Sequence, residues 1–553
     1  MTDRHVLPVE DPVEAAAIVA EIRDCTLTDV LARTAARWSD RPALTWTGHD
    51  GLEVTRTWAE VRSEITDLAA GLIALGLPAG RTVALMAPNC GEHVLLDQAV
   101  VHAGGLPFTV YATSSPEQVA WLAQHSDTDI ALLHGQDQLT RWAGARPRRT
   151  VVVDPVTAGG HPTYDELRAM GRELLASDPG VVDRRRNALA AEDPVALVYT
   201  SGTTGRPKGV VLSHRNVLYK AEAWRRSTGV GPNPVSISYL PYAHVSERVN
   251  GLYVPFLLGG HVHFCGSLEE FPELLARVRP HSLTAVPRIW EKVIARAECI
   301  GAASPERMLA VTGLDRAVCI ASTAAPASPA VGEFFERLGL PVASVYGMTE
   351  TTGGITANRP AAHRPGTVGR LVAGCEARIA GDGELLVRGP LVTSGYLGDP
   401  DATAEFLDSD GWAHTGDLAA VEDGYLRIVG RKKDLLVTAG GENVAPLLVE
   451  NLLQQHPAVA QAMACGDGRR YVTALIVPSA GASEEDLAAA VAAANERLAR
   501  VQQIKTWRTV DRPWTVESGE LTPTLKLRRQ VVAARCAHLV EDMYATESMA
   551  VTQ

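Results

Sequence analysis

The sequence predicts a two-domain α/β protein: a large multi-layer N-terminal domain of α/β sheets with a small β-rich subdomain, followed by a smaller α+β domain. The chain has 553 residues, which is too many for one ordinary hydrophobic core. Amphipathic helical segments alternate with short apolar segments over most of the first 365 residues. After that point, short segments separated by glycine and aspartate take over, as is typical of hairpins.

Residues 58–75 are the clearest expected helix, because apolar residues recur there at alternating spacings of four and three. These residues are Val61, Ile65, Leu68, Leu72 and Leu75. A glycine-containing stop at 76–80 leads into an expected buried strand at 81–87. The same helix–strand order is expected at 98–112, 118–134 and 273–287, whereas residues 145–190, rich in Arg, Pro, Asp and Gly, predict a less regular connection.

Antiparallel strands are expected at 376–381, 383–389 and 424–430. The basic cluster 430-GRKKD-434 then leads into a compact α+β unit. We therefore expect the domains to comprise residues 1–430 and 431–553.

Composition and charge exclude several classes of protein. A net charge of −12 with no basic stripe argues against a nucleic-acid partner. The first residues lack the cationic end and apolar core of an export signal, and no apolar run reaches the roughly 20 residues that span a bilayer. The eight cysteines are scattered without a CxxC pair, which favours reduced thiols over a metal site. A soluble, cytoplasmic protein with no transmembrane segment is expected, and its oligomeric state stays open.

Lysine is rare in this chain, since only seven of the 52 basic residues are lysine. They are residues 208, 220, 292, 432, 433, 505 and 526. A lysine is therefore more informative here than usual, above all beside glycines.

The stretch 199-YTSGTTGRPKGVV-211 predicts a phosphate-binding loop between two strands. Glycines let backbone N–H groups converge, and hydroxyl side chains add donors. The common nucleotide P-loop is excluded, because Pro207 precedes Lys208 and Gly209 follows it. Taken alone, the stretch is equally compatible with a flexible turn.

Four further segments follow in order: 346-YGMTE-350, 414-HTGDL-418, 430-GRKKD-434 and 520-ELTPTLKLRR-529. Together with 199–209 they resemble the adenylate-forming superfamily of acyl-CoA synthetases, luciferases and adenylation domains, from about residue 26 onward. Residues 280–293, 436–446 and 521–529 look most like the long-chain fatty acyl-CoA synthetase branch. The resemblance implies an adenylation domain, a mobile C-terminal domain, and ATP, Mg²⁺ and coenzyme A as ligands.

The resemblance also implies which residues bind the nucleotide. The phosphate loop would use Thr200, Ser201, Gly202, Thr203, Thr204, Gly205 and Lys208, and the other nucleotide contacts would be Thr323, Ala324, Tyr346, Gly347, Asp417 and Arg431. Tyr346 would lie on the adenine and Asp417 and Arg431 on the ribose. A carboxylate has two oxygens that can accept from both ribose hydroxyls.

Four residues are implied to act on the reacting groups. Thr349 would donate to the α-phosphate, and Glu350 would offer Mg²⁺ a hard carboxylate ligand. His244 would lie near the α-phosphate and the acid. Lys526 is the expected catalytic cation, because a positioned ammonium stabilises the negative charge that grows as a carboxylate attacks phosphorus.

A second half-reaction is implied by the same resemblance. The C-terminal domain would rotate about Lys433, withdrawing Lys526 and bringing Gly440 and Gly441 to the site, where missing side chains leave room for a thiol arm.

The acid pocket departs from the long-chain branch. Only 20 residues separate Lys292 from Gly313, and Thr323 and Ser246 replace residues common in that branch. With Tyr242 and Val345 also expected at this pocket, a small acid is predicted.

Three functions stay open on the sequence. The first is an acid–CoA ligase working through an acyl-adenylate. The second keeps adenylation but uses another acceptor, as in a diazotase that adenylates nitrite for an aryl amine, or an amide or carrier-protein ligase. The third is a nucleotide-binding scaffold without catalysis, which the presence of Lys526, Glu350 and Asp417 argues against.

Overall fold

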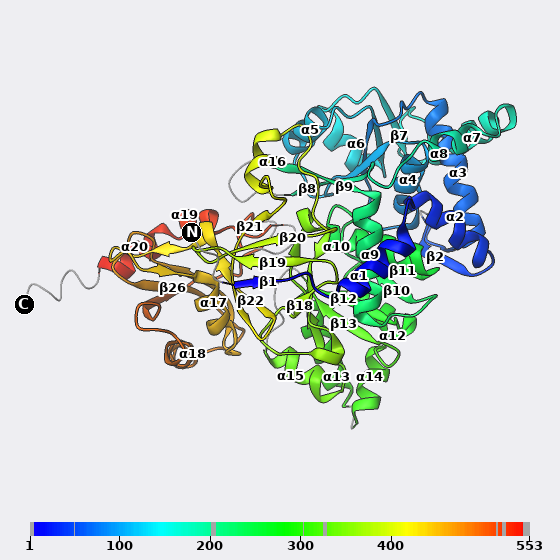
Figure 1. The fold of residues 1–553 in the computed structure, drawn as a ribbon. Helices are drawn as coiled ribbons and strands as arrows, with labels where there is room; N and C mark the ends of the chain where they lie inside the picture. Colours follow the sequence, from blue (N-terminus) through cyan, green and yellow to red (C-terminus); the bar gives the residue numbers. More distant parts are fainter. Residues whose placement is uncertain are drawn as a thin grey trace, which may run out of the picture.

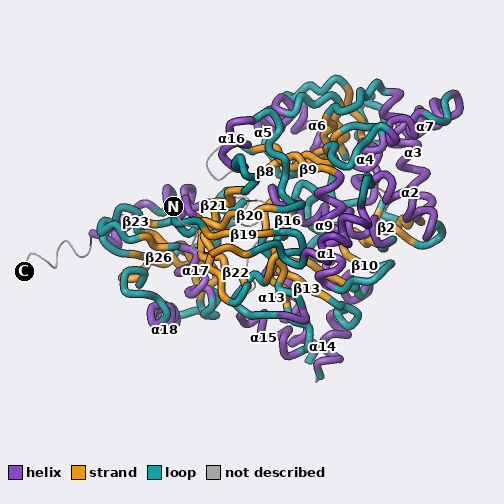
Figure 2. The backbone as a smooth tube through the Cα atoms, viewed as in Figure 1, coloured by secondary structure: helices purple, strands orange, loops and turns teal. Residues whose placement is uncertain are grey.

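The structure of the chain is a computed structural model that describes residues 5–48, 50–200, 206–301, 304–323, 329–515, 518–522 and 527–545 (Figure 1). Its layered α/β architecture confirms the expected fold class. Strands lie inside the layers and helices lie mostly outside them (Figure 2).

The first layer is a parallel sheet with strand order β5-β4-β6-β7. Its elements are β4 (Thr82–Met86), α4 (Gly91–His102), β5 (Leu106–Thr109), α5 (Pro116–His125), β6 (Ile130–Leu133), α6 (Gln136–Trp142) and β7 (Arg149–Val152). All five residues of β4 are buried, as expected for a strand covered on both faces. The antiparallel hairpin of β8 (Pro194–Thr200) and β9 (Lys208–Ser213) packs beside β5 and holds the two ends of the predicted phosphate loop.

Two further sheets lie below the first in Figure 1. The order of one is β10-β11-β2-β3, and that of the other is β12-β13-β14. Their strands are β2 (Pro42–Thr47), β3 (Glu53–Thr57), β10 (Val235–Ser238), β11 (His261–Phe264), β12 (Ser282–Ala285), β13 (Cys319–Ser322) and β14 (Val342–Ser344). Their helices are α2 (Leu27–Arg37), α9 (His214–Thr228), α10 (Val245–Glu247), the π-helix η1 (Arg248–Tyr253), α11 (Val254–Leu258), α12 (Phe271–Val278), α13 (Pro287–Ile300), α14 (Pro305–Thr312) and α15 (Pro329–Arg337).

The expected irregular connection at 145–190 is wrong, because it holds β7 and two helices, α7 (Tyr164–Ser177) and α8 (Val181–Asn187). A reciprocal cap between Thr163 and Glu166 starts α7. The helix then packs closely on α3 (Trp58–Ala74). A Cβ atom on Gly171 would lie only 1.7 Å from the carbonyl oxygen of Asp67, so glycine is required at this crossing.

The β-rich subdomain is an antiparallel sheet with strand order β1-β19-β20-β21-β22. Its strands are β1 (His5–Leu7), β19 (Glu376–Ile379), β20 (Glu384–Arg388), β21 (Ala413–Glu422) and β22 (Tyr425–Arg431). The three strands expected from the sequence are thus confirmed, and the N-terminal segment adds an edge strand. The short pairs β15 (Gly347–Met348) with β16 (Gly353–Gly354) and β17 (Thr356–Ala357) with β18 (Arg370–Leu371) connect this subdomain to the rest.

The last part of the chain has buried apolar clusters of its own, formed by residues from Leu436 onward. Its elements are β23 (Leu436–Val437), β24 (Asn443–Val444), α17 (Pro446–Gln454), β25 (Val459–Cys465), β26 (Val472–Pro478), α18 (Glu484–Glu496), β27 (Ile504–Thr509), α19 (Arg529–Arg535) and α20 (Ala537–Ala545). This part lies to one side of the larger body (Figure 1).

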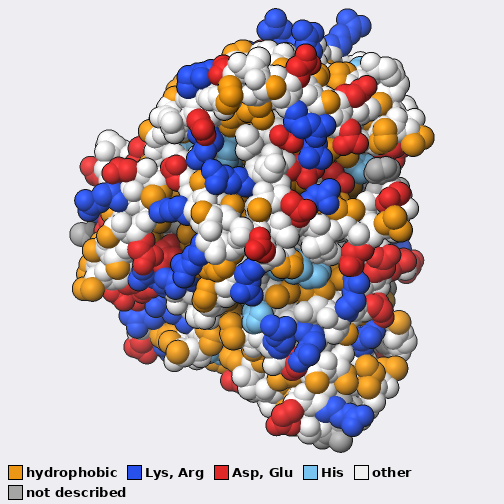
Figure 3. All heavy atoms as spheres, turned by 90° about the vertical axis from the view of Figure 1, so that its right-hand side faces the viewer, with side chains coloured by type: hydrophobic (Ala, Val, Ile, Leu, Met, Phe, Trp, Pro, Cys, Tyr) orange, Lys and Arg blue, Asp and Glu red, His pale blue; other side chains and the backbone are white. Residues whose placement is uncertain are grey.

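The surface seen in Figure 3 intermixes acidic and basic side chains without a continuous basic stripe. No helix among the described residues is both long enough and apolar enough to traverse a bilayer.

Candidate active site

The predicted site residues come from several strands, short helical turns and loops. Ser201, Gly202, Thr203, Thr204, Gly205, Ala324 and Lys526 lie outside the described residues. The remaining predicted residues can be placed.

Asp417 lies at the centre of the first cluster. Its two carboxylate oxygens accept separate hydrogen bonds, one from Arg431 Nε at 3.0 Å and one from Tyr346 Oη at 2.6 Å. The β21–β22 register sets Asp417 directly opposite Arg431, so the strand pairing itself makes the ion pair. Gly416, the residue before Asp417, has a φ of 69°, a conformation that favours glycine.

Burial raises the pKa of Tyr346 well above its usual value, and the adjacent Asp417 charge adds to that shift. Burial opposes the charge of Arg431, but attraction to Asp417 outweighs it and raises the pKa of the guanidinium. At neutral pH the cluster therefore comprises a neutral phenol and a cation that both donate to Asp417.

Glu350 forms the second cluster with Tyr396 and Lys208. Tyr396 Oη donates to Glu350 Oε1 at 2.9 Å, and Lys208 Nζ lies 5.0 Å from the centre of the Tyr396 ring. Glu350 is only 6% exposed. Burial raises its pKa, while Lys208 and Arg431 act in the opposite direction, so the two clusters share one electrostatic environment.

Tyr396 was missed by the sequence reasoning, because nothing in its neighbourhood marks it as a ligand residue. Backbone pairing places it: Val211 N–H donates to the Gly395 carbonyl at 3.1 Å, and Leu397 N–H donates to the Gly209 carbonyl at 2.8 Å. The segment around Tyr396 thus lies along β9, next to Lys208.

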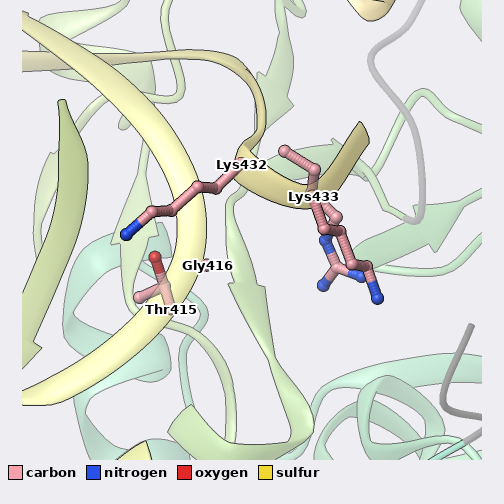
Figure 4. Close-up of a pocket in the computed structure, with 5 residues that line it drawn as sticks. Thr415, Gly416, Lys432 and Lys433 are labelled. Carbon is pink, nitrogen blue, oxygen red and sulfur yellow. The ribbon is translucent and has the colours of Figure 1, made fainter. Parts of the chain in front are cut away.

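A cavity of about 320 Å³ lies beside the first cluster. It is lined by Thr415, Gly416, Arg431, Lys432 and Lys433. Figure 4 shows Lys432 extending toward Thr415 and Lys433 pointing the other way. Three cationic side chains and a hydroxyl suit an anionic ligand.

The segment from Gly347 to Glu350 follows Tyr346 directly. A Cβ atom on Gly347 would lie 1.9 Å from the carbonyl oxygen of Gly353, so the close β15–β16 pairing requires glycine there. Thr349 begins a single 3₁₀ turn that also contains Glu350. The Arg431 charge acts on Glu350, which places the Glu350 carboxylate near the Asp417 cluster. Thr200 ends β8, where its hydroxyl donates to the Lys208 carbonyl at 3.4 Å.

His244 caps the short helix α10. Its Nδ1 accepts from the Ser246 N–H at 3.2 Å, and the Ser246 hydroxyl lies 3.2 Å from the Thr323 hydroxyl. Two residues predicted from separate motifs therefore meet. Helix α10 continues into a π-helix, an irregularity frequent at functional sites.

Tyr242 and Val345, two residues expected at the acid pocket, are buried to different degrees. Tyr242 is 2% exposed, and its hydroxyl donates to the Gly251 carbonyl at 3.1 Å. Val345 is half-buried against the main core. Their assignment to the acid pocket stays a prediction.

The residues around Lys433 are attached to opposite parts of the chain. Lys432 Nζ lies 2.5 Å from Asp382 and 3.0 Å from Glu384, both in the β-rich subdomain. Asp434 instead lies 4.0 Å from Arg529 of the C-terminal part. Burial, followed by the nearby Arg431 charge, lowers the pKa of Lys433.

The segments on either side of Lys526 are anchored. Arg528 N–H donates to the Glu520 carbonyl at 2.8 Å, and Leu521 pairs with Leu527. Arg529 makes two hydrogen bonds to the buried Glu450, at 2.6 and 2.5 Å. Gly440 and Gly441 are exposed in the turn between β23 and β24.

Comparison with known proteins agrees with this arrangement. Residues 31–397 match the family model described as AMP-binding enzyme, and residues 433–548 match the AMP-binding enzyme C-terminal domain. The long-chain-fatty-acid–CoA ligase FadD15 of Mycobacterium bovis is 34% identical, over 90% of this chain and 94% of its own length.

Two solved structures share the fold. The anthranilate CoA ligase AuaEII in complex with anthranoyl-AMP is 21% identical with a TM-score of 0.78, covering 94% of this chain and 98% of its own. The O-succinylbenzoate CoA synthetase MenE of Bacillus subtilis, in complex with ATP and magnesium, is 24% identical with a TM-score of 0.73, covering 91% and 98%.

Proposed function

This chain belongs to the AMP-binding enzyme family, and on that premise we propose that it activates a small carboxylic acid with ATP and then transfers the acyl group to coenzyme A. The proposal is carried by one observation: two buried carboxylates, Asp417 and Glu350, share the electrostatic influence of the same cation. Arg431 forms an ion pair with Asp417, and both Arg431 and Lys208 act on Glu350.

Each member of that group suits part of a nucleotide. Asp417 keeps acceptor capacity for ribose hydroxyls, and Lys208, at the end of the phosphate loop, offers a cation to phosphate oxygens. Glu350 fits Mg²⁺, since a buried carboxylate is a hard oxygen ligand and a cation beside it would offset the cost of burying its charge. Bound Mg²⁺ would neutralise part of the phosphate charge.

In the first half-reaction an oxygen of the acid attacks the α-phosphorus, and the bond to the bridging oxygen of the β-phosphate breaks. The products are acyl-adenylate and pyrophosphate. Thr349 donates to the α-phosphate, and Lys526 stabilises the negative charge that grows there.

In the second half-reaction the thiolate sulfur of coenzyme A attacks the acyl carbonyl, and the bond from that carbon to the AMP oxygen breaks. Thioester and AMP leave. Gly440 and Gly441 leave room for the thiol arm, because they carry no side chains.

Between the half-reactions, domain 431–553 turns relative to domain 1–430 about Lys433. Two sets of contacts support this position for the hinge. Lys432 is bonded to Asp382 and Glu384, whereas Asp434 lies close to Arg529. The residues on either side are fixed to different parts of the chain, so rotation is concentrated at the residue between them.

The small substrate is supported by two features. Helix α13 is followed after a short connection by α14, which leaves no long helical insertion between Lys292 and Gly313. The Ser246–Thr323 hydroxyl pair also gives the expected pocket a polar wall, which suits a short or aromatic acid better than a long hydrocarbon chain.

The experiment is a single-turnover comparison of wild type and Lys526→Ala, with ATP and a panel containing palmitate, octanoate, a cinnamic-type acid, and nitrite plus an aryl amine. Mass spectrometry identifies the products with and without coenzyme A. We expect adenylation to fall about 100- to 1000-fold in the variant, while transfer from a supplied acyl-adenylate stays largely intact.

An equal loss in both half-reactions would contradict the role of Lys526. An adenylate that persists in the presence of coenzyme A would show that the acceptor is not the coenzyme A thiol. A clear preference for palmitate would contradict the small pocket.

A further inference from the structure

Lys220, a residue of α9 that belongs to none of the sequence motifs, ends beside Gly354 and close to Val345, a residue predicted for the acid pocket. Its residue exposure is 3%, and its ammonium donates a hydrogen bond to the carbonyl of Gly354. It is one of only seven lysines in the chain.

No acidic side chain in the described part of the chain forms an ion pair with Lys220. Its ammonium lies 5.3 Å from the centre of the Trp224 ring. Burial lowers the pKa of Lys220 to about 8, and Cys375 acts in the opposite direction. An ammonium has three N–H donors, and among the described residues Lys220 donates to one carbonyl, so it retains capacity for a further acceptor.

The Lys220 ammonium is held at strand β16, because its hydrogen-bond acceptor is the Gly354 carbonyl. Gly354 pairs with Gly347, directly after Tyr346. A Cβ atom built on Gly354 would lie 2.1 Å from Val345 Cγ1 and 3.5 Å from Lys220 Nζ. Lys220 and the predicted pocket residue Val345 therefore approach the same strand.

The helix that carries Ser246 contacts the same strand. Helix α10 packs against β16, and Val249, in the π-helix that continues α10, lies as close to Gly353 as the Lys220 side chain does. Neither Gly353 nor Gly354 has a side chain to separate these groups. Lys220, Val345 and the Ser246 helix thus converge on one pair of glycines.

We propose that Lys220 forms part of the acid pocket and selects acids that carry a second anionic or hydrogen-bond-accepting group, remote from the reacting carboxylate. The inference rests on the proposed function and names the substrate class of that site. A plain hydrocarbon chain would leave the ammonium desolvated and without a further acceptor, whereas a carboxylate, hydroxyl or nitro group would provide one.

The test compares matched pairs of acids by pyrophosphate release in wild type, Lys220→Met, Lys220→Arg and Lys292→Met. One pair is octanoate and the eight-carbon dicarboxylic acid, and the other is cinnamate and its para-carboxylate. Lys292 is an exposed lysine of α13 and serves as the control. The quantity compared is the ratio of kcat/KM within each pair.

Wild type and Lys292→Met are expected to prefer the polar member of at least one pair by about 10- to 100-fold. Lys220→Met should abolish or invert that ratio, chiefly through KM of the polar acid, and Lys220→Arg should retain part of it. A structural role alone would lower both members equally and leave the ratio unchanged.

Two results overturn the inference. One is a wild type that prefers the plain hydrocarbon member of both pairs, which decides the question even if Lys220→Met fails to fold. The other is a ratio that Lys220→Met leaves unchanged. Absence of adenylation with every acid would instead contradict the proposed function itself.

Discussion

Replacing Lys220 with methionine should change how the stability of the protein depends on pH. The pKa of Lys220 is lowered by burial from 10.5 to about 8 in the folded chain. At about 1.36 kcal/mol per pKa unit, this corresponds to roughly 3 kcal/mol between the two protonation states. Below pH 8 both the folded and the unfolded chain carry the proton, so wild type bears the full cost of the buried charge.

Between pH 8 and 10.5 the unfolded chain binds a proton that the folded chain does not, and wild type therefore gains stability with rising pH. Lys220→Met has no such group. We expect the stability of the variant relative to wild type to fall by about 3 kcal/mol from pH 7 to pH 10.5. Contributions independent of pH, such as the lost bond to Gly354, cancel from this change.

The assay is thermal unfolding of both proteins from pH 7 to 10.5, with Lys292→Met as the control. Titration of other groups affects all three proteins alike, so only the difference in Tm is interpreted. A difference between wild type and Lys220→Met that stays constant with pH would refute a desolvated ammonium.

Two further predictions concern the C-terminal part. Lys433→Pro should permit adenylation but slow transfer to coenzyme A at least tenfold in single-turnover assays, because proline fixes φ at the proposed hinge; wild-type overall turnover would exclude Lys433 as the pivot. Arg529→Met should destabilise the C-terminal part by about 3–5 kcal/mol, because Glu450 is 4% exposed and would be left as an unpaired buried charge. The double variant Arg529→Met/Glu450→Leu should recover most of that loss in thermal unfolding, and no recovery would show that the ion pair is not the cause.

Local patterns were sufficient for much of the fold. The apolar spacing from Val61 to Leu72 predicts α3, and the apolar run after it predicts β4, because one helical face and one buried strand each leave a direct mark on the sequence. Helix α7 was not predicted from its local sequence pattern. Its close approach to α3 depends on Gly71 and Gly171, and glycine weakens a helical pattern at the positions where packing demands it.

Candidate site residues could be named from the sequence only where one short motif contains both the residue and its context, and their roles stay predictions. Asp417 and Arg431 lie in such motifs, and the β21–β22 register brings them together. Tyr396 is placed by pairing of its neighbours with β9, far away in the sequence. Lys220 is placed by a hydrogen bond from its side chain on α9 to the Gly354 carbonyl of β16. Contacts of this kind depend on tertiary packing, which no local pattern records.

The hydrogen bonds already made by Asp417 bear on how a ribose can bind. A carboxylate has about four acceptor sites, and Arg431 and Tyr346 occupy one on each oxygen. The remaining site on each oxygen can accept from one hydroxyl of a vicinal diol, so ribose binding does not require the Arg431 ion pair to break. Because the protein donors fix the carboxylate before the ligand arrives, little reorganisation remains for the binding step. The same bonds make Tyr346 a support for Asp417 in addition to its proposed role as a surface for the adenine. We therefore expect Tyr346→Phe, which keeps the aromatic ring, to weaken binding of AMP.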